Sequence, residues 1–132
     1  MSDRTFVDTN VLIWVLNDDR ALTRRMRAVI SSPTASLHIS VVSAWEIAIK
    51  YALGKLPLPE SPDRYVPRRM TASGSRGLSV EHAHALRVAE LPMHHRDPFD
   101  RLLVAQAQIE KLTVVTVDPQ FRAYDVQVRF AS

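Results

Sequence analysis

The amino-acid sequence predicts one α/β domain with a central, mostly parallel β-sheet that is flanked by helices. Short β-prone segments alternate with longer helical segments, which is the pattern of a parallel sheet whose crossovers are helices. The chain has 132 residues, 46% of them hydrophobic, and is long enough to bury a core of its own. Because no repeat or low-complexity segment interrupts it, we expect a single domain over residues 1–132.

The first two expected elements are a short strand and a helix whose cap directly follows that strand. Residues 5–7 are β-prone and end at Asp8, and Asp8-Thr9-Asn10 is typical of a helix start. The apolar run over 11–16 therefore suits a helix, although the same residues would also suit a strand. Two elements are expected next, a basic helix over 23–31 and a strand over 36–40.

The middle of the chain is expected to be mainly helical, with breaks at glycine and proline. Helical periodicity over 41–53 ends at Gly54, a typical C-terminal cap. A further helix is expected to be interrupted near Pro67 and to close at Ser73-Gly74. The elements expected after it are a short strand over 78–80 and a helix through Glu90 that Ser79 caps.

The clearest helix start in the sequence is Asp97-Pro98, with Asp97 at the cap and Pro98 at the first helical position. This helix is expected to run to Lys111. Two strands complete the expected fold, one over 112–117 that Asp118-Pro119 ends, and one over 126–130.

On the helix that begins at Pro98, one acidic residue lies on an apolar face. Asp100 shares that face with Leu103, Val104 and Ala107, which follow at three, four and seven positions. A carboxylate at the head of an apolar stripe loses hydration unless a cation, a hydrogen-bond network or a shifted pKa compensates. The sequence therefore predicts a specific partner for Asp100.

Four carboxylates are expected at one edge of the sheet. Asp8 and Asp118 directly follow two of the expected strands. Glu46 lies early in the helix after another strand, and Asp100 begins a helix that leads into a strand. Because ligands of parallel α/β sheets bind beyond the carboxyl ends of the strands, the four side chains could meet at one site.

Each of these acids also has a purely structural explanation. Asp8 could cap the following helix, and Asp118 before a proline could start a turn. Glu46 follows Ser43 at capping-box spacing and precedes Lys50 by four residues, which suits a helical ion pair. These explanations do not require all the acids to fall at the same end of the strands.

The residue types indicate the chemistry of such a site. The chain has no cysteine, so thiolate metal sites and disulfides are excluded. Carboxylate oxygens without an evident His pair suit Mg²⁺ or Mn²⁺, which also bind substrate phosphates, and this favours metal-assisted phosphodiester hydrolysis. Arg96 and Arg101 flank the acidic helix start and could hold a neighbouring phosphate or keep the carboxylates apart by ion pairing. His94 and His95 could shuttle protons or simply hydrogen-bond within the loop.

Arginine dominates the basic residues, with 14 Arg against 3 Lys in a chain of net charge +3. Arginine suits phosphate recognition and therefore a polyanionic partner, although arginine clusters are also common on solvated helix faces. The N-terminus has no secretory signal, and the longest apolar run, 11–16, is far too short to span a bilayer. We therefore expect a soluble, cytoplasmic protein without membrane association.

Four segments of the chain carry a resemblance to a known family. They are Phe6-Val7-Asp8-Thr9-Asn10-Val11-Leu12; Ser43-Ala44-Trp45-Glu46-Ile47-Ala48-Ile49-Lys50 with Gly54-Lys55-Leu56; His95-Arg96-Asp97-Pro98-Phe99-Asp100-Arg101-Leu102-Leu103-Val104-Ala105-Gln106-Ala107; and Thr116-Val117-Asp118 with Phe121. The first resembles the opening motif of PIN-domain nucleases. The second and third resemble motifs of their VapC toxin branch, and the fourth is similar to the last motif.

This resemblance implies a single PIN domain over 1–132 and a Mg²⁺- or Mn²⁺-dependent endoribonuclease that hydrolyses RNA. It further implies the toxin of a type II toxin–antitoxin pair, with a VapB-type antitoxin as partner and a homodimeric state. By motif, the catalytic and metal-binding acids would be Asp8, Glu46, Asp100 and Asp118. Asp100 is preferred to Asp97 because its segment aligns with the broader PIN pattern, and Asn10 departs from the histidine that many close relatives carry.

Two other classes of function stay open from the sequence. A noncatalytic RNA-binding protein would explain the arginines but not a carboxylate cluster, which repels phosphates without metal. An aspartate-based phosphoryl-transfer protein also places acids at strand ends, but dehalogenase-like phosphatases commonly begin Asp-x-Asp, whereas here Thr9-Asn10 follows Asp8. A nucleotide-driven enzyme is not expected, because the chain has no glycine-rich phosphate loop.

Overall fold

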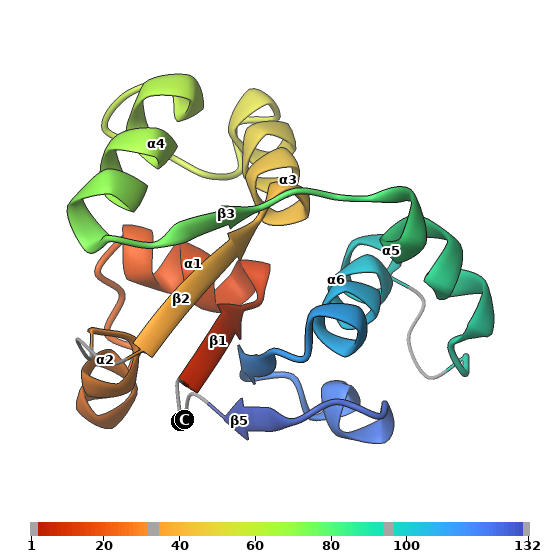
Figure 1. Ribbon diagram of the computed structural model, residues 1–132. Helices are drawn as coiled ribbons and strands as arrows, with labels where there is room; N and C mark the ends of the chain where they lie inside the picture. Colours follow the sequence, from red (N-terminus) through yellow and green to blue (C-terminus); the bar gives the residue numbers. More distant parts are fainter. Residues whose placement is uncertain (1–2, 32–34, 94–96, 131–132) are drawn as a thin grey trace.

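The computed structural model of the chain describes residues 3–31, 35–93 and 97–130, and these form one five-stranded sheet with helices around it (Figure 1). The strands lie in the order β3-β2-β1-β4-β5, and every neighbouring pair is parallel. Their bounds are β1 Asp3–Val7, β2 Ala35–Ser40, β3 Arg76–Leu78, β4 Thr113–Thr116 and β5 Val128–Phe130. The predicted α/β class with a parallel sheet is confirmed.

The helices connect these strands as the alternating pattern predicts. Their bounds are α1 Thr9–Leu16, α2 Arg24–Ser31, α3 Val41–Ala52, α4 Pro62–Ser73, α5 His82–Arg87 and α6 Pro98–Glu110, with short 3₁₀ turns η1 Val88–Glu90 and η2 Pro119–Ala123. The ambiguous run over 11–16 is helical, because Asp8 caps it and the strand before it ends at Val7. No helix in the described ranges is long and apolar enough to cross a membrane.

Alternating side chains of the central strands supply two hydrophobic cores, one on each face of the sheet. Val7 of β1 and Val115 of β4 belong to the core that α1, α2 and α4 cover. Phe6 and Val114, one residue earlier in each strand, belong to the core that α6 covers. All four side chains are at most 1% exposed, so β1 and β4 form the centre of the domain.

The predicted interruption of a helix near Pro67 is wrong, because α4 runs unbroken from Pro62 to Ser73. Proline inside a helix removes one backbone hydrogen bond, and here tertiary contacts offset that loss. Tyr65 and Val66 are buried, and the Tyr65 hydroxyl donates to the carbonyl oxygen of Leu16 at 2.8 Å. Gly74 closes the helix at φ +69°, as expected for a left-handed C-terminal cap.

The predicted cap at Ser79 is also wrong, because α5 begins three residues later with Glu81 as its cap. The Glu81 amide donates to Nδ1 of His84 at 3.0 Å, and Nε2 of His84 lies 2.9 Å from Oε2 of Glu110 on α6. His84 is 1% exposed, so this imidazole joins α5 to α6 inside the protein. In this capping box, His84 takes the place three residues after the cap where glutamate or glutamine is usual. The sequence therefore gives no simple signal that the helix starts at His82 and not directly after Ser79.

The parallel topology places the ends that matter for function at one edge of the sheet. The carboxyl ends of β1, β2 and β4 lie together, because the three strands are neighbours and point the same way. Helix α6 directly precedes β4 and packs on the sheet, so it runs back antiparallel to this strand and its first turn lies at the same edge. Lys111 makes the tight reversal between them with a left-handed backbone, φ +56°.

Because Lys111 is exposed and its conformation favours glycine, Lys111→Gly should stabilise the protein. We expect a gain of about 0.5 to 1 kcal/mol, since the relief of left-handed strain exceeds the added flexibility of the unfolded chain. Lys111→Ala is the matched control, because it removes the same side chain but keeps the strain. Thermal unfolding in EDTA measures both variants, and an equal melting temperature for the two would contradict the assignment of strain to this residue.

Candidate functional site

Asp8 follows β1 directly and is only 2% exposed. Its Oδ1 accepts a hydrogen bond from the Val11 amide at 2.9 Å, which makes it the N-cap of α1. Its own amide donates to the carbonyl oxygen of Val115 in β4 at 3.1 Å, and its Oδ2 accepts from the Thr116 hydroxyl. The structural explanation of Asp8 as a cap is therefore correct, and the same carboxylate lies between the ends of two strands.

The environment of Asp8 opposes its negative charge. The pKa of Asp8 is raised from 3.8 to about 6, mainly by burial and to a smaller extent by the negative charges of Asp118 and Glu46. The hydrogen bonds from Thr116 and Val11 lower this pKa and offset only part of the effect. Asp118 and Glu46 are therefore each close enough to Asp8 to act on its carboxylate electrostatically.

Thr116 is a site residue that the sequence analysis did not single out. It is the last residue of β4, is fully buried, and donates its hydroxyl proton to Asp8. The same hydroxyl oxygen accepts the backbone amide of Asp118 at 3.0 Å. Thr116 therefore holds two of the predicted acids in a fixed relation. The sequence does contain a signal for this role. Thr116 lies two positions after Val114 and therefore on the same, core-facing side of the strand, where a hydroxyl group needs a hydrogen-bond partner.

Glu46 lies in the middle of α3, and its side chain is 13% exposed. Its Oε2 lies 3.4 Å from Nζ of Lys50, the ion pair expected from the spacing. Within the described part of the chain, its buried Oε1 has no hydrogen-bond partner. A buried carboxylate oxygen without a partner is costly, so a cation or a bound donor would compensate it.

The alternative that Ser43 and Glu46 form a capping box is wrong. The N-cap of α3 is Ser40, whose hydroxyl oxygen accepts the Val42 amide at 3.0 Å. Ser43 is fully buried inside the helix, and its hydroxyl lies 2.9 Å from the hydroxyl of Thr9 in α1. This contact holds α3 beside the residue that follows Asp8.

Asp118 and Asp97 are both N-caps, Asp118 of the short 3₁₀ turn η2 and Asp97 of the long helix α6. Oδ1 of Asp118 accepts the Gln120 amide at 2.9 Å at the start of η2, as the alternative of a turn residue predicts. Oδ1 of Asp97 accepts the amides of Phe99 and Asp100 at 2.9 and 3.4 Å, so the predicted cap of α6 is confirmed.

Asp100 lies half-buried in the first turn of α6 and accordingly near the same edge of the sheet. The ring of Phe99, the preceding residue, meets the ring of Trp45 edge-on with centroids 5.0 Å apart. Trp45 precedes Glu46, so this aromatic contact joins the two helix segments that carry Glu46 and Asp100. The fold thus brings all four predicted acids to one edge of the sheet.

The acids do not form a closed metal shell in this structure. Across residues 3–31, 35–93 and 97–130, no three acidic or histidine side chains are arranged to hold one metal ion. The donor set nevertheless fits a hard divalent cation, because all its atoms are carboxylate oxygens, one of them buried without a partner. Mg²⁺ commonly takes one or two protein carboxylates and completes its shell with water and phosphate oxygens.

The expected phosphate contact through Arg101 is wrong. Arg101 is 8% exposed, and its guanidinium donates to the carbonyl oxygens of Pro92, Val88 and Leu91 at 2.9, 3.1 and 3.4 Å. These bonds direct it to the backbone after α5 and not to a ligand. Arg96, the other expected phosphate contact, and the histidines at 94 and 95 lie outside the described residues.

Comparison of the sequence with known proteins gives two matches. Residues 5–127 match the family model of the PIN domain. A segment of 58 residues is 53% identical to Ribonuclease VapC16 of Mycobacterium tuberculosis, and the match spans 44% of this chain and only 41% of that protein.

Solved structures share the fold over nearly the whole chain. The VapBC2 structure from Rickettsia felis, bound to promoter DNA, has a TM-score of 0.73 at 14% identity and covers 97% of this chain and 98% of that one. The DNA-bound VapBC structure from Salmonella typhimurium has a TM-score of 0.68 at 17% identity and covers 100% of both chains. FitAcB from Neisseria gonorrhoeae has a TM-score of 0.67 at 22% identity and covers 94% of this chain and 95% of that one.

The raised pKa of Asp8 predicts how the metal-free protein responds to pH. A carboxyl whose pKa is higher in the folded state than in the unfolded state costs stability once it is ionised, and the cost falls as pH drops through about 6. Between about pH 7.5 and about pH 5, the wild-type protein should gain about 1 kcal/mol relative to Asp8→Asn. Urea unfolding in EDTA at both pH values measures this difference, and a difference of zero or of opposite sign would contradict it.

Proposed function

This chain belongs to the PIN-domain family, and from that premise we propose that it is a divalent-metal-dependent endoribonuclease that hydrolyses RNA phosphodiester bonds. The observation that carries the proposal is the negative charge gathered at the carboxyl edge of the sheet, where Asp8 has a raised pKa and Glu46, paired with Lys50 through Oε2, keeps a buried Oε1 without a partner in the described chain. A cation is the simplest partner for both. The similarity to Ribonuclease VapC16 supports ribonuclease activity and RNA as the substrate.

In this proposal Asp8, Glu46, Asp100 and Asp118 hold Mg²⁺ or Mn²⁺, and water and substrate phosphate oxygens complete its coordination. The cation supplies Lewis-acid activation of water and neutralises negative charge on the attacked phosphate. The chain fixes the positions of these acids. Thr116 orients Asp8 and Asp118, and Lys50 pairs with one oxygen of Glu46 and leaves the other available to a ligand.

The structure weighs against the two rival functions. A noncatalytic RNA-binding surface would gain nothing from several like charges at one edge of the sheet, which repel phosphate. In an aspartate-based phosphoryl transfer, Asp8 would attack the phosphate. Here Asp8 is 2% exposed, and both its oxygens already accept hydrogen bonds, from Val11 and Thr116. A cap held in this way is a poor nucleophile.

The two aspartates at the start of α6 separate catalysis from helix capping. Asp100→Asn should reduce RNA cleavage by several orders of magnitude at saturating Mn²⁺, because a neutral amide replaces a metal ligand poorly. Asp97→Asn is the matched control, since the amide oxygen can still cap Phe99 and Asp100. The measurement is cleavage of a structured RNA panel with mapped cut sites, with Mg²⁺, Mn²⁺ or EDTA, together with thermal melting.

If the wild-type protein still cleaves RNA in EDTA, the proposed dependence on a divalent metal is wrong. If Asp97→Asn abolishes cleavage while Asp100→Asn stays active, the choice of the third acid is wrong. Binding of divalent metal should also raise the melting temperature of the wild type, because only the folded state has the site.

We also propose that the chain is the toxin of a type II toxin–antitoxin pair and acts in the cytoplasm with a VapB-type antitoxin. The structurally similar chains come from VapBC and FitAB complexes, which is the comparison that supports this partner. A homodimer is proposed on the same footing. Val41 and Trp45, one turn apart on α3, are apolar and 51% and 58% exposed, so a second copy would cover them.

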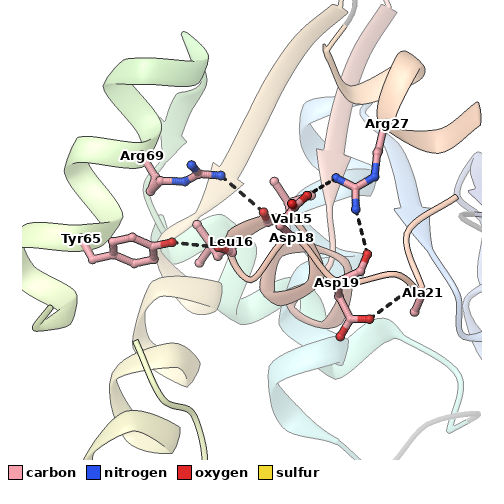
Figure 2. Close-up of polar contacts among 8 residues, drawn as sticks. All are labelled: Val15, Leu16, Asp18, Asp19, Ala21, Arg27, Tyr65 and Arg69. Carbon is pink, nitrogen blue, oxygen red and sulfur yellow. Dashed lines mark hydrogen bonds and ion pairs between the residues drawn. The ribbon is translucent and has the colours of Figure 1, made fainter. Parts of the chain in front are cut away.

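An apolar cavity supplies a place where an antitoxin segment would anchor. It has a volume of about 360 Å³ and lies between α1, α2, α4 and the sheet, with Leu12, Ile30 and Val66 among its lining residues. Figure 2 shows how its rim is held: Tyr65 and Arg69 of α4 donate to the carbonyl oxygens of Leu16 and Val15 at the end of α1. These bonds satisfy the last carbonyls of α1 and tie α4 to the end of α1.

A charge at the mouth of this cavity should weaken antitoxin binding without affecting cleavage. Ala72 is exposed on α4 and lines the cavity, so Ala72→Glu should weaken the complex with the small protein encoded beside this chain. Thr71→Glu, at the exposed neighbouring position that does not line the cavity, is the control. Co-purification and cleavage assays measure both. Equal binding by the two variants would exclude the cavity, and the absence of growth impairment and of any neighbouring partner would exclude the toxin assignment.

A further inference from the structure

Gln106 is a polar side chain in the middle of the core. It belongs to α6, is fully buried, and uses both ends of its amide. Its Oε1 accepts a hydrogen bond from the Ser40 hydroxyl at 2.5 Å, and its Nε2 donates to the carbonyl oxygen of Ser79 at 3.2 Å. Because an apolar side chain of the same size would fill this space without any polar group to satisfy, packing alone does not explain a glutamine here.

The partners of Gln106 lie at the ends of two strands. Ser40 is the last residue of β2 and the N-cap of α3, and its hydroxyl oxygen also accepts the Val42 amide at 3.0 Å. Ser79 directly follows β3. One side chain of α6 thus holds the carboxyl ends of β2 and β3 and the start of α3. The hydroxyl of Ser40 has a single proton, so its donation to Gln106 and its cap of α3 act as one unit.

These contacts relate the two helices that carry opposite sides of the acidic site. Glu46 lies on α3, six residues after Ser40, and Asp100 lies on α6, six residues before Gln106. The ring contact of Trp45 with Phe99 joins the same two helices near the acids. That ring contact is apolar, whereas the hydrogen bonds of Gln106 require a defined direction of donor and acceptor. Gln106 therefore supplies a directional link between α6 and the start of α3.

We propose that Gln106 is a positioning residue that sets the placement of α3 and its Glu46 relative to α6 and its Asp100. This inference rests on the proposed metal-dependent function. Side chains that orient metal ligands without touching the metal typically change metal affinity by about 10- to 100-fold when they are replaced. Being fully buried, Gln106 does not contact RNA, so its replacement acts on the metal and on turnover but not on substrate binding.

Gln106→Met tests the inference, and Gln108→Met is its matched control. Gln108 lies on the same helix, and its Oε1 accepts from Nε of Arg87 in α5 at 3.1 Å, so it makes a comparable contact that does not involve the acid-bearing α3. We expect Gln106→Met to weaken Mn²⁺ binding about tenfold by calorimetry, and to lower kcat with little change in KM for RNA. Gln108→Met should keep the wild-type values of all three.

The outcomes separate this inference from the function it rests on. If the wild type binds Mn²⁺ and cleaves RNA while Gln106→Met matches it in affinity and kcat, Gln106 is merely structural and the inference is overturned. Equal losses in Gln106→Met and Gln108→Met overturn it as well. If the wild type neither binds metal nor cleaves RNA, the proposed function fails and the inference falls with it. Should Gln106→Met not fold, Gln106→Asn keeps the amide but shortens the side chain, and the same comparison decides.

Discussion

The pairing of β1 with β2 on one side and with β4 on the other is the constraint on which this structure depends. Parallel pairing forces the three carboxyl ends to one edge, and every acid of the candidate site is attached to that edge by a strand end or by a helix next to it. The register is set by side chains that alternate between two buried cores, so a slip by one residue would exchange Phe6 and Val7 and bury the wrong faces. The geometry of the site is thus a consequence of core packing.

Sequence reasoning reached the fold class and the edge but not several of the local details. Caps that depend on neighbouring backbone amides, such as Asp8 and Asp97, were predictable because the chemistry is local. The unbroken helix through Pro67 was not, since buried Tyr65 and Val66 hold it from outside the helix. Tertiary contacts override local propensity at that point, and a pattern read along the chain does not contain them.

The same division applies to the site. The placement of Asp8 and Asp118 behind strand ends was predictable, because residue type and position after a strand are visible in the sequence. The roles of Arg101, Thr116 and Gln106 depend on partners 9 to 108 positions away in the chain. Arg101 illustrates the risk: a basic residue beside acids suggests phosphate, yet its guanidinium is buried against backbone carbonyls. Which atoms a buried polar side chain meets is decided by the three-dimensional packing.

The helix-capping roles of Asp8 and Asp118 affect the design of an inactive variant for studies of substrate complexes. Asp8 and Asp118 each accept a backbone amide, from Val11 and Gln120, so their replacement loosens a helix start together with any loss of chemistry. Glu46 lies within α3, where its neighbours satisfy the backbone without it. In the proposed site, Glu46→Gln would therefore remove an acidic charge and leave the start of α3 intact, at the loss of the ion pair with Lys50.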